Sequence, residues 1–216
     1  MSAHRAEADG RAPLRADAAR NRAQILRAAR AAFRERGTAV PMEEIARRAG
    51  VNIATLYRRF PDRDALVAQV LIDGFTLVLG AARDARDRAP QDALGALEDF
   101  LLRAIEARDE LVLPLIGGPS TDSPEALEVQ REIAPALAEL LAHARAQGTV
   151  RADVTPVDLI TAAVLACRPL PLLPADQAAA LASRHVRVFL DGLRPDGTRT
   201  LPPGPTSEQL SAHLRL

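Results

Sequence analysis

The stretch that decides the fold runs from residue 42 to residue 63 and reads MEEIARRAGVNIATLYRRFPDR. Apolar residues first recur with the spacing of one face of an α-helix, at Met42, Ile45, Ala46 and Ala49. A second set with helical spacing follows, at Ile53, Leu56 and Phe60. The two patterns predict two short helices that meet across a turn of about three residues.

The turn between these helices carries its own chemical signals. Gly50 has no Cβ, so it can end the first helix with a positive φ. Asn52 is a good N-cap for the second helix. Together these residues predict a helix-turn-helix, the arrangement in which the second helix can enter the major groove of DNA.

The outward face of the second helix suits a nucleic acid. It carries small side chains and hydrogen-bond donors, at Asn52, Ala54, Thr55, Tyr57, Arg58 and Arg59. Hydroxyl and guanidinium groups bind phosphates, while a small residue such as Ala54 lets the helix approach the edges of the bases. The same pattern is also compatible with an αα-hairpin whose arginine face is only solvated.

The distribution of charge separates these two interpretations. The chain of 216 residues has a formal net charge of +0, but residues 1–70 hold 14 Arg against 8 Asp and Glu, a net charge of +6. Residues 71–216 hold 14 Arg against 20 acidic residues, a net charge of −6. Because phosphates attract the basic part and repel the acidic part, the distribution favours DNA as the partner.

The residues around this motif resemble a known family. The run GTAVPMEEIARRAGVNIATLYRRFPDRDALVAQVL, with RNRAQILRAARAAFRERG just before it, is similar to the DNA-binding domain of the TetR family of bacterial transcriptional regulators. The resemblance extends from about Asp17 to Leu71. It implies a homodimer that binds a palindromic double-stranded DNA operator, acts as a repressor and is released by a small-molecule effector.

The resemblance also implies roles for single residues. By position, Thr55, Tyr57 and Arg59 would lie at the DNA, and Arg63 would contact the DNA backbone from the start of the next helix. The chain departs from the family pattern where Val40 and Pro41 replace the frequent Ser or Thr cap, which removes a hydroxyl that could bind phosphate.

The rest of the chain predicts an all-α protein, because no alternating apolar run is long enough for a sheet. Helical patterns cover about 17–36, 62–88, 91–109, 124–147, 155–168 and 175–193. Four regions are expected: a flexible N-terminal arm at 1–16, the helix-turn-helix DNA-binding domain at 17–62, a larger helical ligand-binding and dimerisation domain at 63–194, and a Pro/Gly-rich tail at 195–216.

The larger domain has to supply the sensing and dimer functions that the resemblance implies. Candidate ligand-binding residues are Phe75, Leu79, Phe100, Ile105, Leu115, Ile116 and Cys167, with Arg103 and Arg168 as charged candidates. Residues like the apolar ones are more often plain core than pocket lining. With 3% aromatic residues, the candidates favour a modest apolar or weakly acidic effector. The late helices can pair with a second copy through their apolar residues, at Leu159, Leu181, Val188 and Phe189. The run ADVTPVDLITAAVLACRPLPLLPADQAAAL resembles the body of a subgroup of TetR-like regulators common among actinobacteria.

Other classes of function find little support. The four histidines are scattered, so we expect no metal site, no cofactor and no catalytic residues. We expect no apolar stretch of about 18 residues and no signal peptide, and the single Cys167 suits a reducing cytoplasm. The alternative that stays open is a helical enzyme or scaffold protein whose hairpin does not bind DNA.

Overall fold

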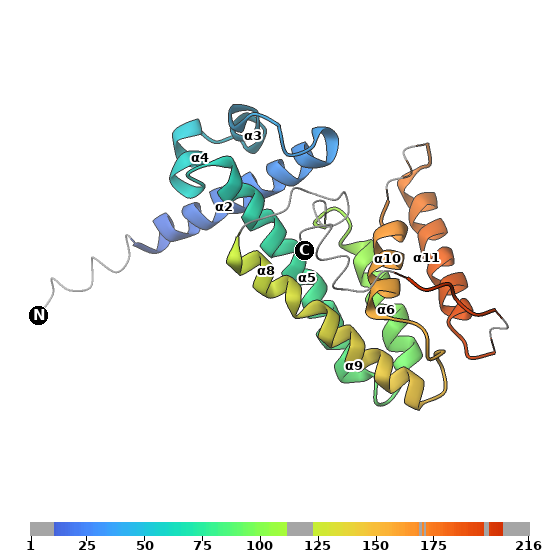
Figure 1. Cartoon of the computed structure of the whole chain (residues 1–216). Coiled ribbons are helices and arrows are strands. Elements are labelled where there is room, and N and C mark those ends of the chain that lie inside the picture. The colour runs from blue at the N-terminus through green and yellow to red at the C-terminus, as the bar shows by residue number, and fades with distance from the viewer. Residues whose placement is uncertain (1–10, 112–122, 169, 171, 197–198, 205–216) are drawn as a thin grey trace, which may run out of the picture. The chain divides into compact units, whose positions relative to one another are not determined.

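The computed structural model describes residues 11–111, 123–168, 170, 172–196 and 199–204, with side chains from residue 17 onward (Figure 1). All regular structure in these residues is α-helix, which confirms the all-α prediction. The helices are α2 (Arg11–Arg36), α3 (Met42–Ala49), α4 (Ile53–Arg59), α5 (Arg63–Arg88), α6 (Ala93–Glu106), α8 (Pro124–Arg131), α9 (Ile133–Ala146), α10 (Pro156–Ala166) and α11 (Ala175–Gly192). The chain forms two compact units, Met1–Val70 and Leu71–Leu216.

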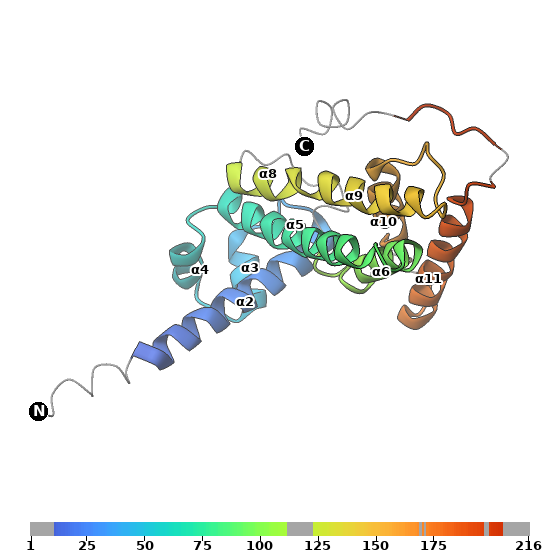
Figure 2. The same cartoon turned by 90° about the horizontal axis from the view of Figure 1, so that it is seen from below.

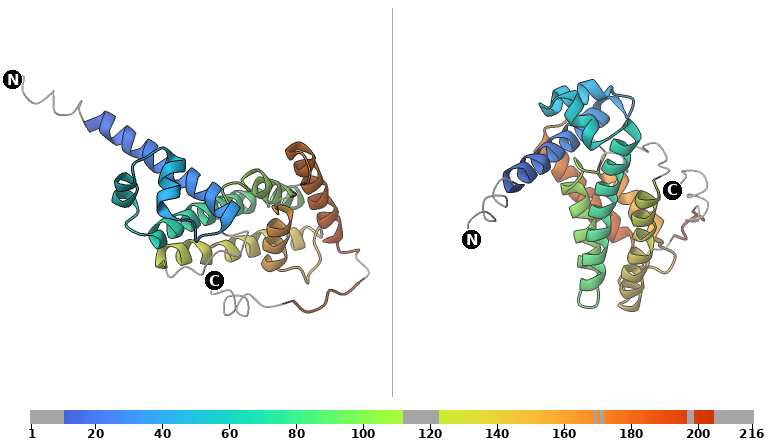
Figure 3. Two further views of the ribbon diagram at one scale, coloured as in Figure 1. Left: turned by 90° about the horizontal axis from the view of Figure 1, so that it is seen from above. Right: turned by 90° about the vertical axis from the view of Figure 1, so that its left-hand side faces the viewer.

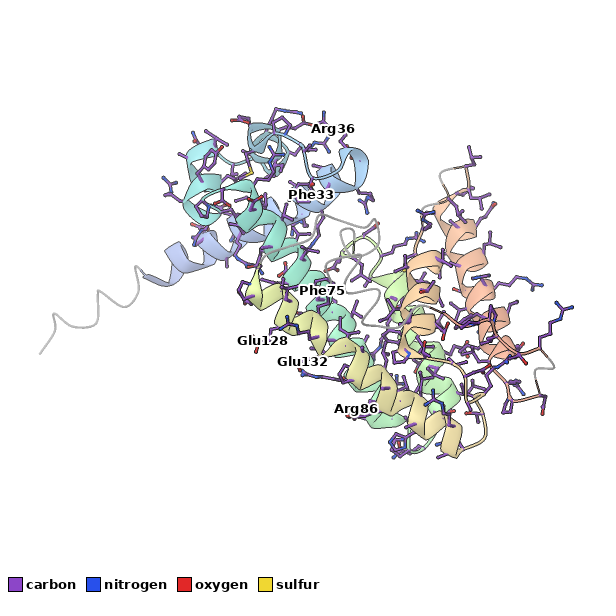
Figure 4. The ribbon with its side chains drawn as sticks, viewed as in Figure 1. Phe33, Arg36, Phe75, Arg86, Glu128 and Glu132 are labelled. Atoms are coloured by element: carbon purple, nitrogen blue, oxygen red, sulfur yellow. The ribbon has the colours of Figure 1, made fainter. Side chains whose placement is uncertain are left out.

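The first unit consists of α2, α3, α4 and the first turns of α5. Its core is apolar and comes from all four helices, at Ile25, Leu26, Ala29, Phe33, Ile45, Leu56, Leu66 and Val70. Figure 4 marks Phe33, which is fully buried, and Arg36 at the end of α2. Because this core holds α3 and α4 by their inner faces, their outer faces are exposed.

The helix α2 begins at Arg11, six residues before the predicted start at residue 17. The helix predicted at about 17–36 therefore starts earlier than expected, and residues 11–16 of the predicted arm lie in α2. The segment RAPLRADAAR is rich in Ala and Arg, which are strong helix formers. Its proline, Pro13, falls in the first turn, where proline costs no intrahelical hydrogen bond. The scarcity of apolar residues marked this segment as loose, but helix propensity decides its conformation.

The second unit contains the remainder of α5 and the helices from α6 to α11. The helix α6 contacts α9, α10 and α11, and Figure 3 shows α10 and α11 beside it. Large apolar side chains with almost no exposed surface fill this unit, at Leu97, Phe100, Leu101, Leu137, Leu140, Leu141 and Leu159. No polar or charged residue of the described chain is fully buried, so apolar packing dominates the stability of this unit.

The predicted helix at 124–147 is two helices. The helix α8 ends at Arg131 and α9 begins at Ile133, although the two continue in nearly the same direction (Figure 2). Pro135 explains the break, because proline has no N–H to donate to the carbonyl of Arg131 and its ring crowds that oxygen. The apolar periodicity runs through the break, so periodicity alone did not predict it.

The expectation that the chain has no long apolar stretch is wrong for α5. This helix contains an 18-residue window with a mean hydropathy of 1.9, long and apolar enough by composition to cross a membrane, although no such stretch was expected. Of that window, 44% is buried inside the protein. Its apolar side chains enter the cores of both units, with Leu66 in the first and Leu79 in the second. Core packing in two units accounts for the apolar composition.

Candidate nucleic-acid interface

The turn of the helix-turn-helix has the predicted geometry. Gly50 has φ +68°, and its N–H and that of Val51 donate to the last carbonyls of α3. Asn52 caps α4, because its Oδ1 accepts a hydrogen bond from the N–H of Ala54 at 2.8 Å. Both predictions at this turn are confirmed. The two caps fix where α4 starts and in which direction it leaves the turn.

The start of α3 reflects the departure from the family pattern. Pro41 occupies the N-cap position, and α3 has no side-chain cap. Its carbonyl still accepts hydrogen bonds from Glu44 and Ile45 at 3.1 and 3.2 Å, so the helix begins regularly. The structure thus bears out the prediction that this end of α3 offers no cap hydroxyl to a phosphate.

The helix α4 and its N-cap expose most of the residues predicted to contact DNA. Asn52, Ala54, Arg58 and Arg59 are exposed, and Tyr57 exposes 43% of its surface, which is high for a tyrosine. Thr55 is half-buried, and its Oγ1 accepts a hydrogen bond from Nη2 of Arg58 at 2.8 Å. All of these residues lie within one short segment, the N-cap Asn52 and the seven residues of α4.

The predicted backbone contact, Arg63, lies at the first position of α5 and is half-buried. Its Nη1 donates to the carbonyl of Thr38 at 2.7 Å, which joins α5 to the loop that precedes α3. A guanidinium has five N–H donors, so this bond leaves others for a phosphate. Asp62 caps α5, because its Oδ1 accepts a hydrogen bond from the N–H of Ala65 at 2.7 Å.

A group of ion pairs that joins α2 and α3 was not predicted from sequence. Glu44 on α3 binds Arg36 on α2 and, at 2.9 Å, Arg48 on its own helix. Arg48 also binds Glu35 at 2.7 Å. The hydrogen bond from Arg36 is the main reason that the pKa of Glu44 lies below its ordinary value. The Glu44–Arg48 pair could have been predicted from sequence, because residues four apart on a helix are neighbours. The pairs with α2 depend on tertiary packing and could not.

Arg22 on α2 contacts the end of α4. The guanidinium carbon of Arg22 on α2 lies 5.9 Å from the ring centre of Phe60, the C-cap of α4. That geometry is a cation–π contact, which holds the end of α4 near α2. Arginines therefore serve this unit in two ways: some stabilise its packing, and those on α4 remain outward.

The candidate ligand-binding residues separate into different environments in the second unit. We call the hollow along α5 and α6 the α5–α6 groove; its volume is about 510 Å³ and its lining includes Thr76, Leu77, Val78, Gly80, Ala81, Asp84, Phe100, Arg103, Ala104, Glu106, Ala107, Glu110 and Leu111. Of the candidates, Phe100 and Arg103 line it. Phe75, marked in Figure 4, and Leu79 are buried but do not line the groove.

The remaining candidates lie elsewhere. Cys167 is buried behind α6, where its Sγ donates to the carbonyl of Ala104 at 3.2 Å. Ile105 is also buried, and Arg168 is exposed outside the groove lining. Leu115 and Ile116 fall outside the described residues. Within the described residues, no group of three or more His, Cys, Asp and Glu could hold a metal ion.

Comparison with known proteins adds the identity of both units. The family profile described as bacterial regulatory proteins of the TetR family matches residues 25–70, which include the helix-turn-helix. A second profile, the C-terminal domain of SbtR-like transcriptional regulators, matches residues 83–195, more than half of the chain. The chain belongs to the TetR family of bacterial transcriptional regulators.

Solved structures of TetR-family regulators agree with this assignment. A TetR transcription regulatory protein from Mycobacterium vanbaalenii is 38% identical over 84% of this chain and 99% of its own, with a TM-score of 0.54. The regulator SCO0520 from Streptomyces coelicolor is 30% identical over 81% and 99%, also with a TM-score of 0.54. AibR, solved with isovaleryl coenzyme A and operator DNA, shares the fold at 20% identity over 82% and 98%, with a TM-score of 0.60. A comparison with curated proteins gave no match.

Membership in the TetR family decides between the two readings of the sequence. The family consists of transcriptional regulators with a helix-turn-helix, not of enzymes, so the predicted regulator is confirmed and the alternative of a helical enzyme is set aside. The basic charge predicted for residues 1–70 belongs to the same residues as the first compact unit. In this TetR-family chain, the exposed face of α4 is accordingly the candidate DNA-reading surface.

Proposed function

We propose that this TetR-family regulator is a homodimeric repressor that binds a palindromic DNA operator and is released by a small-molecule effector. The observation that carries the proposal is the capped helix α4, which exposes Tyr57, Arg58 and Arg59 on a unit with a net charge of +6. Tyr57 and Arg59 would bind phosphates, and Ala54 and Thr55 would face the bases. Such a protein acts in the bacterial cytoplasm, where the chromosome lies.

The late helices support the dimer. Large apolar side chains remain exposed on them, with Leu165 55% exposed, Leu181 49% and Val188 59%. Exposed apolar residues concentrated on two neighbouring helices are typical of a surface that another protein covers. A second copy is the natural partner, because one helix-turn-helix reads only a few base pairs and twofold pairing doubles its contacts.

The effector site that we propose is the α5–α6 groove. Its volume of about 510 Å³ lies within the range of small-molecule sites, roughly 300–1,000 Å³. The groove borders α5, the helix that also supplies residues to the core of the DNA-binding unit. A ligand would release DNA only if it binds the DNA-incompetent conformation more tightly than the competent one.

The proposal is tested with the full-length protein and a duplex selected by it from a random pool. We expect the selected duplex to be palindromic and to bind about a thousandfold or more tightly than a scrambled duplex. Fluorescence anisotropy should show an affinity that falls by roughly a thousandfold between 50 and 200 mM salt, because phosphate contacts release counterions. Equal affinity for both duplexes, or no binding at low salt, would contradict the proposed function.

Substitutions on α4 refine this test. Arg59→Ala removes one phosphate contact from each protomer, so the slope of log affinity against log salt should fall by about two for the dimer. Tyr57→Phe should weaken binding severalfold with unchanged helicity, because only a hydroxyl is lost. Arg131→Ala on α8, which removes the same charge from an exposed site in the other unit, is the matched control and should leave both duplex affinity and slope unchanged.

A further inference from the structure

The α5–α6 groove is lined by more negative than positive charge. Three carboxylates contribute to its lining, at Asp84, Glu106 and Glu110, and one guanidinium, at Arg103. The lining therefore has a net formal charge of −2 at neutral pH. A site with this charge attracts cations and repels anions.

The positive charge in the lining already has a partner. Arg103 on α6 forms an ion pair with Asp84 on α5, on the wall of the groove. A carboxylate or phosphate ligand would have to break this pair to gain a partner, and would do so beside the carboxylate of Glu106. The cost of breaking the ion pair and the repulsion from Glu106 both disfavour an anionic ligand.

Glu106 is the lining carboxylate best placed to receive a ligand. It is the last residue of α6, it is exposed, and its carboxylate makes no hydrogen bond or ion pair with any residue that the structure describes. Its charge is therefore not neutralised by a described side chain. A cation that enters the groove can approach this carboxylate without displacing another group.

The rest of the lining is suited to an apolar body. Side chains without charge form much of the wall, at Leu77, Val78, Ala81, Phe100, Ala104, Ala107 and Leu111. Leu77 exposes 40% of its surface, so ligand binding would remove apolar area from water. Gly80 also lines the groove, and a Cβ built there meets no atom within 4 Å. A molecule of several rings or a branched aliphatic body has room in about 510 Å³.

We propose that the α5–α6 groove binds an organic cation with an apolar body, of the class of quaternary ammonium, phosphonium or protonated amine compounds. The apolar wall holds the body, and Glu106 together with the net negative lining attracts the charge. The inference rests on the proposed function, because it names the chemical class of the effector. It replaces the weakly acidic effector that composition favoured with a ligand of opposite charge.

The test compares two probes of the same shape and opposite charge, tetraphenylphosphonium and tetraphenylborate. Isothermal titration calorimetry on the full-length protein without DNA should show at least tenfold tighter binding of the phosphonium. Glu106→Gln should weaken phosphonium binding severalfold, and Arg103→Gln, which leaves Asp84 without its partner, should strengthen it. Glu128→Gln, an equivalent change of charge on α8 outside the groove, should have no effect.

A second variant locates the binding site. Gly80→Leu should fill the groove and abolish binding of the phosphonium, while the space around Gly80 and the helix preference of leucine keep the fold intact. Circular dichroism checks the fold of each variant. Unchanged phosphonium binding by folded Gly80→Leu, or equal affinity for the two probes, would overturn the inference.

Operator binding measured in parallel separates this inference from the proposed function. If the protein binds its selected duplex but not tetraphenylphosphonium, the ligand class is wrong and the DNA-binding regulator stands. If the phosphonium binds in the groove without changing duplex affinity, the ligand class stands and release by this ligand fails. If the phosphonium binds and lowers duplex affinity, both are supported.

Discussion

Cys167 shows how packing determines the chemistry of one residue. Burial raises the pKa of its thiol to about 11, slightly offset by the charge of Arg108. At pH 8 only about one thiol in a thousand is then ionised, and the thiolate is the reactive form. We therefore expect Cys167 in the folded protein to react with a disulfide reagent such as 5,5′-dithiobis(2-nitrobenzoic acid) at least about a hundredfold more slowly than in urea. Fast reaction of the folded protein would contradict its placement as a packing residue.

The raised pKa also predicts a dependence of stability on pH. The folded protein holds the thiol proton more tightly than the unfolded chain, so this contribution is fully present below about pH 8.5 and is lost as the pH rises through about 11. The free energy of unfolding of the wild-type protein should fall over that window relative to Cys167→Ser, which has no thiol to titrate. Urea denaturation at a series of pH values measures the difference, and parallel curves would exclude the effect.

The helix α4 depends on its cap more than longer helices do, because it has only seven residues. Asn52→Ala removes the acceptor for the N–H of Ala54 and should lower the free energy of unfolding by about 1 kcal/mol. Asn52→Asp keeps an acceptor and adds a charge that the start of a helix favours, so stability should be retained. If position 52 lies near DNA phosphates, as the sequence predicts, the added charge should lower duplex affinity about tenfold or more.

These two variants distinguish a structural role of Asn52 from a DNA-binding role. Thermal unfolding followed by circular dichroism reports the first role, and duplex anisotropy reports the second. If Asn52→Ala left the melting temperature unchanged, the cap would contribute nothing to stability. If Asn52→Asp bound the duplex as tightly as the wild type, position 52 would not lie near DNA phosphates.

Local chemistry explains which elements could be predicted from sequence. The turn at Gly50 and Asn52 was predicted because each signal acts within a few residues of its effect. The break before Pro135 was missed because the apolar pattern continued through it. The bond from Arg63 to Thr38 spans 25 residues and follows only from the packing of the first unit. The residues that line the α5–α6 groove were the hardest to predict from sequence, because neighbouring helix faces of similar composition can form either the core or the groove lining.

At the scale of the whole molecule, the proposed dimer depends on the exposed apolar side chains of α10 and α11. In one chain, Leu181 is 49% exposed and Val188 59% exposed. The substitutions Leu181→Glu and Val188→Glu therefore place a charge in contact with water, and the monomer should fold normally. In a dimer that covers these residues, the carboxylate would be buried without a partner, which is strongly unfavourable. Light scattering should then report a mass near 23.1 kDa for the variants and twice that for the wild type.

The same variants should lose operator binding although they leave the residues of α4 untouched. A monomer has half of the phosphate and base contacts and no twofold match to a palindrome, so we expect affinity to fall by about a hundredfold or more. Ala142→Glu on the exposed side of α9 adds the same charge elsewhere and should keep both the dimer mass and the affinity. A dimer that persists in Leu181→Glu and Val188→Glu would move the interface away from these helices. If the interface does lie on α10 and α11, each dimer would carry two copies of the basic first unit, so the net charge of +0 of one chain would not prevent DNA binding.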